Sequence, residues 1–173
     1  IPINKEKIKA IAYEALQLAI LAAYTQGLNL ILTASKNFGY EVEIKRAIKV
    51  WRAGCIIRSL LLNDLYEAFD KNSSLTNILA SKVFNTQVQN QQSSLKELVK
   101  TALEVQVSAA AFTSALFYIQ SYTANQLPSN LIQAQRDYFG AHTYERIDKP
   151  RGEFFHTNWT GRGGDTASTT YEV

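Results

Sequence analysis

Arg136 and His142 are the two side chains in this sequence whose types and spacing best suit the binding of an anion. If the helix that carries Arg136 ends near Gly140, both side chains project from its last turn and the following loop. A guanidinium holds a phosphate through two parallel hydrogen bonds, and a nearby imidazole adds a third donor. The alternative is an exposed arginine paired with Asp137 or Glu145, together with a structural histidine. Spacing alone favours this alternative, so a phosphate site is a hypothesis at this point.

A second cluster with chemical potential lies between Trp51 and Ser59. Its small residues allow two helices to approach closely at a bend. Arg52 and Arg58 could bind an anion, although ion pairs on a helix surface are the more ordinary role for them. Cys55 precedes two isoleucines and is interpreted as a small buried hydrophobe rather than a nucleophile.

Several motifs that would define an enzyme site are absent from the sequence. The glycines at 161–164 neither follow a predicted strand nor open a helix, so they are not a dinucleotide fingerprint. The sequence has no phosphate-binding P-loop and no nucleophile elbow. The two histidines, His142 and His156, lack the spacing of metal ligands. We therefore expect no metal site and no self-contained catalytic apparatus.

The elements that position these clusters are predicted to be helices. Only Pro2, Pro128 and Pro150 interrupt the chain, and glycine is sparse before Gly140. Hydrophobic periodicity predicts helices over 5–35, 41–52, 56–69, 75–80, 82–107, 108–125 and 130–139. Gly39 is expected to cap the first helix in a left-handed conformation. The predicted fold class is all-α, a multi-helix domain with long central helices.

The first predicted helix carries two adjacent apolar rows, which indicate burial over most of its circumference. One row is Ile8, Ile11, Ala15, Leu18 and Ala22, and the other is Ala12, Leu16, Ala19 and Ala23. In the helix over 82–107, the polar middle at 87–94 is expected to face solvent.

After Gly140 the helical period disappears and the chain becomes rich in glycine and threonine. Large aromatic residues are unusual for a solvated tail, so we expect an extended arm that lies across another surface; they are Phe154, Phe155, Trp159 and Tyr171. The predicted division is a helical domain over 1–140 and an extended tail over 141–173.

Charge and composition exclude some partners. The chain has 18 basic and 15 acidic residues, and its net charge of +3 is dispersed, which disfavours a nucleic-acid binder. The most apolar stretch, Ala15 to Tyr24, contains Gln17 and is too short for a membrane span, and no signal peptide precedes it. One cysteine favours a reducing compartment. Because the chain starts at Ile1 and has no methionine, we expect a fragment or a processed piece.

Three segments resemble signatures of the decarboxylating 6-phosphogluconate dehydrogenase family. The run over 130–145, NLIQAQRDYFGAHTYE, resembles the family's C-terminal signature. Residues 51–59 resemble a second signature, and 156–161 resemble the start of the family's tail. The segments lie in the family's order and spacing, and the likeness extends over nearly the whole chain. The sequence departs from the family at Ala53, where glycine is usual, and at 107–109, where a proline-containing break is common.

The resemblance implies the C-terminal part of an NADP-dependent oxidoreductase of the pentose phosphate pathway and gluconate utilization, located in the cytoplasm. Such enzymes convert 6-phosphogluconate to ribulose 5-phosphate and CO2, and they are homodimers. Their N-terminal Rossmann domain, general base lysine and general acid glutamate lie upstream of this chain. We therefore expect no catalytic residue here and no dehydrogenase activity from this piece alone.

The resemblance also assigns roles to residues of this chain. Arg136 matches the arginine that binds the substrate phosphate in the partner subunit, and His142 matches the histidine that helps to close that site. A tail stretch that approaches NADP from the partner subunit aligns with Ser168, Thr169, Thr170 and Tyr171. With the resemblance, the phosphate site becomes the preferred interpretation of Arg136. The alternative is a non-catalytic helical dimerisation module that kept the fold and lost the chemistry.

Overall fold

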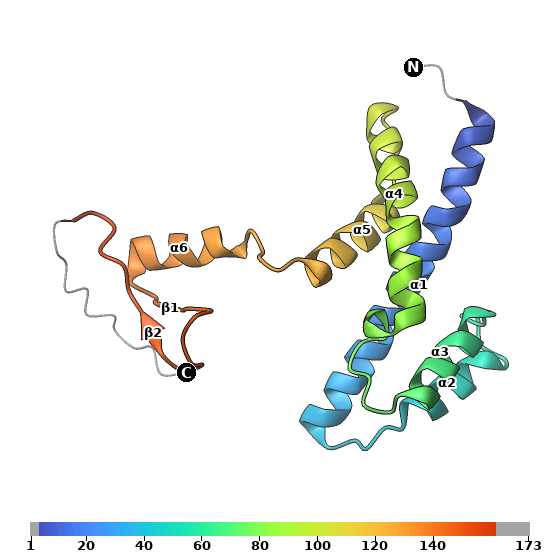
Figure 1. Cartoon of the computed structure of the whole chain (residues 1–173), viewed down its shortest axis with the longest axis horizontal. Coiled ribbons are helices and arrows are strands. Elements are labelled where there is room, and N and C mark those ends of the chain that lie inside the picture. Colours follow the sequence, from blue (N-terminus) through green and yellow to red (C-terminus); the bar gives the residue numbers. More distant parts are fainter. Residues whose placement is uncertain (1–3, 162–173) are drawn as a thin grey trace. The chain divides into compact units, whose positions relative to one another are not determined.

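The computed structural model describes residues 4–161 of the chain (Figure 1). Residue contacts divide the chain into an N-terminal unit, Ile1–Tyr122, and a C-terminal unit, Thr123–Val173. Helices dominate the described residues, which confirms the predicted all-α class. The first unit contains the helical elements α1 (Lys5–Phe38), α2 (Ile44–Arg52), α3 (Leu61–Lys71), η1 (Ile78–Ala80), α4 (Lys82–Glu104) and all but the last residue of α5 (Ala110–Thr123).

The long helix α1 begins and ends at residues whose chemistry suits those positions. The Asn4 side chain accepts a hydrogen bond from the backbone N–H of Lys7 at 3.1 Å. Gly39 takes the left-handed conformation at φ 67°, and its N–H donates to the carbonyl of Ser35. An N-terminal asparagine and a C-terminal glycine satisfy backbone groups that a helix end leaves without partners. The predicted Gly39 cap is confirmed.

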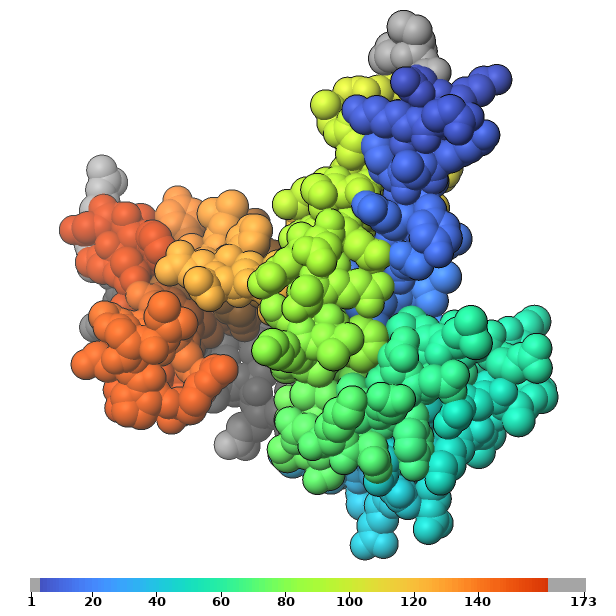
Figure 2. All heavy atoms as spheres, turned by 45° about the vertical axis from the view of Figure 1, so that its right-hand side comes forward, coloured from blue at the N-terminus to red at the C-terminus, as the bar shows by residue number. Residues whose placement is uncertain are grey.

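The helices α1 and α4 lie side by side, and both contribute buried residues to the core of the N-terminal unit (Figures 1 and 2). Leu18 of α1 and Leu95 of α4 are both fully buried. The second apolar row of α1 is less covered than predicted, because Leu16 remains 49% exposed and Ala23 is exposed.

The prediction that the polar middle of α4 faces solvent holds only in part: Gln89, Asn90 and Ser93 are exposed. Val88 is buried, and Gln91 is half-buried. The Nε2 of Gln91 donates to the Oε1 of Gln17 on α1 at 2.8 Å. The Oε1 of Gln91 accepts from Nε2 of Gln87 on the same helix, so the half-buried amide has partners on both atoms and can lie within this interface.

The third predicted helix starts five residues later than expected. Residues 53–60 form an irregular link, in which Gly54 adopts φ 70°. The hydroxyl of Tyr24 donates to the carbonyl of Ile57, and the Ser59 hydroxyl accepts from the N–H of Leu61 at 3.2 Å. In both contacts a side-chain hydroxyl replaces a backbone partner of an α-helix, so this segment is not helical. The short helix expected over 75–80 is a single 3-10 turn, η1.

By length and composition, α1 is able to cross a membrane, since an 18-residue window of it has a mean hydropathy of 1.4. The expectation based on Ala15 to Tyr24 underestimated this apolar segment, because α1 continues to Phe38. Core helices of soluble proteins pass the same test. Part of the apolar surface of α1 packs against α4.

The described residues of the C-terminal unit, up to 161, form one complete helix and a small antiparallel ladder. α6 (Ser129–Gly140) is followed by β1 (Tyr144–Glu145) and β2 (Phe154–Phe155) (Figure 1). Tyr144 pairs with Phe155, and Glu145 pairs with Phe154. The sequence predicted an extended chain after Gly140 but not this pairing, which folds the segment back on its own unit.

Candidate functional site

The end of α6 has an unusual backbone. Ala141 adopts φ 46° and its N–H donates to the carbonyl of Asp137 at 3.0 Å, which ends the helix. Two residues later, Thr143 adopts φ 58°. Non-glycine residues seldom take positive φ values, and such conformations persist only where the surrounding contacts hold them. His142 lies between these two residues.

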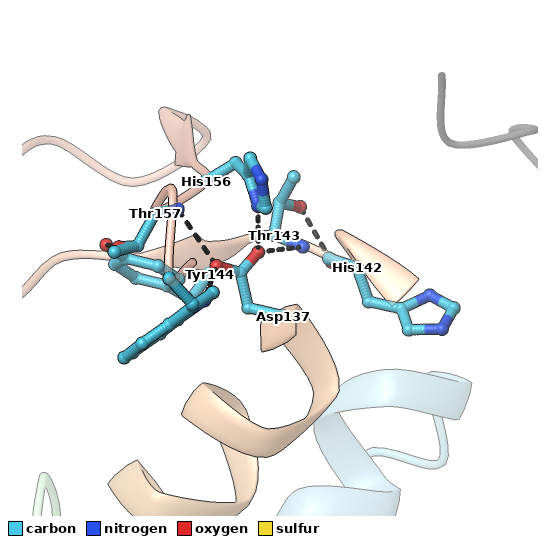
Figure 3. A network of polar contacts seen from close by, with 7 residues as sticks. Asp137, His142, Thr143, Tyr144, His156 and Thr157 are labelled. Carbon is cyan, nitrogen blue, oxygen red and sulfur yellow. Dashed lines mark hydrogen bonds and ion pairs between the residues drawn. The ribbon is translucent and has the colours of Figure 1, made fainter. Parts of the chain in front are cut away.

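Asp137 is the centre of the contacts that hold this loop. Its side chain is completely buried, and each carboxylate oxygen has two partners. Oδ1 accepts from the N–H of Thr143 at 3.1 Å and lies 2.9 Å from Nδ1 of His156 (Figure 3). Oδ2 accepts from the N–H of Thr157 at 2.9 Å and from Nε1 of Trp159 at 2.8 Å. One carboxylate therefore joins α6, the loop after it and the segment after β2.

Two opposing effects act on the pKa of Asp137. Burial by itself raises the pKa, because it penalises the charged form. The hydrogen bonds from the Thr157 N–H, His156 and Trp159 stabilise the carboxylate and outweigh burial, so the pKa lies below its ordinary value. Because an ionised carboxylate only accepts hydrogen bonds, Nδ1 of His156 is the donor in this pair.

His142 is exposed and points away from Asp137 (Figure 3). Its ring lies edge-on to Phe139, with 6.0 Å between the ring centroids. A Cβ atom added to Gly140 would lie only 2.4 Å from Nε2 of His142. The ring therefore occupies the space that a side chain at Gly140 would fill. His156, rather than His142, is the histidine bound to a buried carboxylate.

Arg136 is also exposed, and its Nη1 donates to the Oε1 of Gln133 at 2.7 Å. The alternative pairing of Arg136 with Asp137 or Glu145 is wrong. Asp137 binds the loop and the segment after β2, and Glu145 binds Arg151 and the N–H of Gly152. Within residues 4–161, no carboxylate forms an ion pair with Arg136.

Arg136 and His142 come from the last two turns of α6 and from the loop that follows it. No hydrogen bond joins the two side chains in the part of the chain that the structure describes. Each instead has a neutral neighbour, Gln133 or Phe139. Such a guanidinium keeps most of its donors available for an anion.

The second cluster does not form the ion pairs that its sequence favoured. The guanidinium of Arg52 lies over the ring of Tyr66, 5.7 Å from the centroid. Among the described residues, neither Arg52 nor Arg58 pairs with a carboxylate. Both line one cavity of about 490 Å³, together with Ser59, Leu60 and Asn63. Cys55 is half-buried.

Two further expectations concern cofactor and metal. The family's tail stretch that approaches NADP aligns with Ser168, Thr169, Thr170 and Tyr171, which lie outside the described residues. Across 4–161, His, Cys, Asp and Glu side chains form no group of three or more able to hold a metal ion.

Comparison with known proteins identifies the family. The family model described as "6-phosphogluconate dehydrogenase, C-terminal domain" matches residues 2–159. The chain belongs to this family. A relative from Haemophilus influenzae, named "6-phosphogluconate dehydrogenase, decarboxylating", is 47% identical over 169 residues, covering 95% of the chain and 35% of the relative. A relative of the same name from Mus musculus is 43% identical over 160 residues, covering 92% of the chain and 33% of the relative.

A solved family structure has the same fold. The 6-phosphogluconate dehydrogenase of Plasmodium falciparum matches with a TM-score of 0.84 and 33% identity, covering 91% of this chain and 33% of that one. That protein was solved without ligand, with its cofactor NADP+ and with its substrate 6-phosphogluconate. The chain spans about a third of the length of these 6-phosphogluconate dehydrogenases.

Sequence reasoning missed the role of Asp137. An acidic residue next to Arg136 on a helix is ordinarily solvent-exposed, and it was considered only as a partner for that arginine. Three of its four donors belong to His156, Thr157 and Trp159, about twenty positions later. The only signal available was that both segments belong to stretches that resemble the family.

Proposed function

We propose that the chain is the C-terminal part of an NADP-dependent 6-phosphogluconate dehydrogenase, which converts 6-phosphogluconate to ribulose 5-phosphate and CO2 in the cytoplasm. Its roles are homodimer formation and completion of the substrate site in the partner subunit. Residues 1–140 act as the dimerisation and substrate domain, and residues 141–173 as the tail that docks on the partner. The base, the acid and the Rossmann domain belong to the remainder of the enzyme.

The observation that carries this proposal is the state of Arg136 and His142. Both are exposed at the end of α6, and within 4–161 neither forms an ion pair with a carboxylate. A phosphate carries close to two negative charges at neutral pH and binds best to donors that no protein carboxylate has neutralised. We infer that Arg136 binds the phosphate of 6-phosphogluconate and that His142 adds a donor to it.

The decisive experiment is the Arg136→Ala substitution in the intact enzyme. We expect substrate binding to weaken by about 2–5 kcal/mol, because a charged group of the bound substrate loses its partner. This loss corresponds to a rise of at least about 30-fold in the KM for 6-phosphogluconate, measured by steady-state kinetics. Arg151→Ala is the matched control, since Arg151 is an exposed arginine of the same unit that is paired with Glu145. An unchanged KM for Arg136→Ala would overturn the assignment.

NADP is proposed as the cofactor because the chain belongs to a dehydrogenase family and a solved relative was studied with NADP+. The cofactor supplies the hydride acceptor in the proposed reaction. No residue in the described part of this chain is assigned to it. We expect the 173-residue chain alone to produce no NADPH from 6-phosphogluconate, because the proposed catalytic residues are elsewhere in the enzyme.

The same variant tests the alternative of a non-catalytic dimerisation module. A module that kept only the fold has no need for an exposed arginine without a carboxylate partner at the end of α6. Such a module would dimerise normally with either arginine or alanine at position 136 and would not bind 6-phosphogluconate. Sedimentation analysis and substrate titration of the intact protein distinguish the two functions.

A further inference from the structure

The residues on both sides of His142 form hydrogen bonds with Asp137. The N–H of Ala141 donates to the backbone carbonyl of Asp137, and the N–H of Thr143 donates to its side chain. His142 is the residue between these two contacts. Its backbone is therefore fixed from both directions by Asp137, in a conformation with positive φ on either side.

The Asp137 carboxylate is itself held by a separate segment. Its second oxygen accepts from the N–H of Thr157 and from the indole N–H of Trp159. The orientation of the carboxylate is thus set by the chain after β2, independently of the loop at 141–143. A side chain with fixed partners on both oxygens loses its rotational freedom, and the cost of ordering the loop is met when the unit folds.

Asp137 fixes the backbone of this loop, and the absence of a side chain at Gly140 leaves room for the His142 ring. A Cβ atom at this position would lie 2.4 Å from Nε2, 2.6 Å from Cδ2 and 3.3 Å from Cε1 of His142. Real Cβ atoms do not approach a ring so closely, so any side chain here must displace the imidazole. Gly140 is the last residue of α6, its φ is not positive, and its backbone accommodates alanine.

We propose that Gly140 and Asp137 are positioning residues for the His142 imidazole: Asp137 holds the loop that carries it, and Gly140 leaves free the space that the ring occupies when it faces the phosphate. This proposal rests on the proposed function of His142. Neither residue offers a side chain to the phosphate: the Asp137 carboxylate is buried, and Gly140 has no side chain. Their contribution is that the imidazole is already in place when the substrate arrives, which lowers the entropy lost on binding.

The Gly140→Ala substitution separates positioning from stability. The methyl group favours the helix and displaces only the imidazole, so the fold is retained. In the intact enzyme we expect the KM for 6-phosphogluconate to rise about tenfold, the effect of losing one hydrogen bond to a charged group. The kcat and the KM for NADP should remain within about twofold, since one site alone is altered. Gly27→Ala is the control, because a Cβ at Gly27 of α1 meets no atom within 4 Å.

A double substitution gives a readout that loss of stability would not produce. In the His142→Ala background the imidazole is gone, so Gly140→Ala should have no further effect on the KM. Trp159→Phe removes one donor to Asp137 while keeping an aromatic ring, and it should raise the same KM by a smaller factor, again only when His142 is present. Both results would support the positioning role.

These KM measurements distinguish a failure of the positioning role from a failure of the proposed phosphate site. If Arg136→Ala and His142→Ala raise the KM but Gly140→Ala leaves it unchanged, the phosphate site stands and the positioning role is wrong. Equal effects of Gly140→Ala with and without His142 would also overturn the positioning role. If Arg136→Ala leaves the KM unchanged, the proposed function itself fails.

Discussion

Replacing Asp137 by alanine should loosen the C-terminal unit far more than the loss of a surface charge would. The carboxylate accepts from two half-buried backbone groups, the N–H of Thr143 and the N–H of Thr157. In Asp137→Ala both donors lose their acceptor, and the protein around them restricts their access to water. His156 and Trp159 are more exposed, so water can replace the carboxylate at their ring nitrogens.

The size of the effect follows from these two backbone hydrogen bonds. A hydrogen bond to a charged acceptor contributes about 1.5–3 kcal/mol. Because neighbouring bonds are not additive, we expect Asp137→Ala to cost the C-terminal unit about 3–5 kcal/mol, which is the range for breaking a buried pair by removing one partner. Since 1.36 kcal/mol corresponds to a factor of ten, local opening should become at least about 100-fold more frequent.

Amide hydrogen exchange measures this opening directly, residue by residue. The N–H groups of Thr143 and Thr157 should exchange at least about 100-fold faster in Asp137→Ala, while the buried amides of α1 and α4 keep their rates. Asp148→Ala is the matched control, because Asp148 is an exposed aspartate of the same unit, paired with Arg146. Unchanged exchange at Thr143 and Thr157 would refute the inference that Asp137 holds the loop.

We also expect low pH to weaken the contacts of Asp137, and truncation of Leu18 to destabilise the helical core. The pKa of Asp137 lies below its ordinary value in the folded protein, so its stabilising contribution is complete above about pH 4 and is lost as the pH falls through the lowered pKa. The indole N–H resonance of Trp159 should therefore shift towards its unfolded position in acid. In Asp137→Asn this chemical shift should change much less with pH. The same pH dependence in Asp137→Asn as in the unmodified protein would contradict this prediction. Leu18→Ala should destabilise the N-terminal unit by about 2–5 kcal/mol in urea unfolding, because Leu18 is fully buried between helices. Leu30→Ala, at a 70% exposed position of the same helix, should cost much less, and equal losses would disprove this account of the core.

The helical body was largely predictable, because helix formation depends on residues close together in sequence. Periodicity placed α1, and Gly39 marked its end as expected. The missed details are places where a distant partner competes with the local pattern. Residues 53–60 leave the helical path where Tyr24 hydrogen-bonds to Ile57, and Gln91 turns inward to meet Gln17. Neither contact has a signature in the local sequence.

The sequence indicated the candidate site only in part. Spacing alone favoured an ion pair for Arg136, and only the resemblance to a family made a phosphate site at Arg136 and His142 the preferred prediction. Their surroundings were not predictable, since whether Arg136 has an ion-pair partner depends on where Glu145 and Asp137 point in three dimensions. The structure directs both carboxylates to other donors. That leaves the guanidinium with Gln133.

The sequence by itself determined the helices, the left-handed cap at Gly39 and the membership of a dehydrogenase family, because each depends on local patterns or on a long run of matching residues. Only the tertiary structure decided that the Asp137 carboxylate is buried and which groups donate hydrogen bonds to it. A carboxylate on a helix is exposed or buried according to what approaches it, and here the segment over 156–159 folds back and supplies three donors. The physical reason is that hydrogen bonds across about twenty residues form only when the chain between them has folded, and no local preference encodes them.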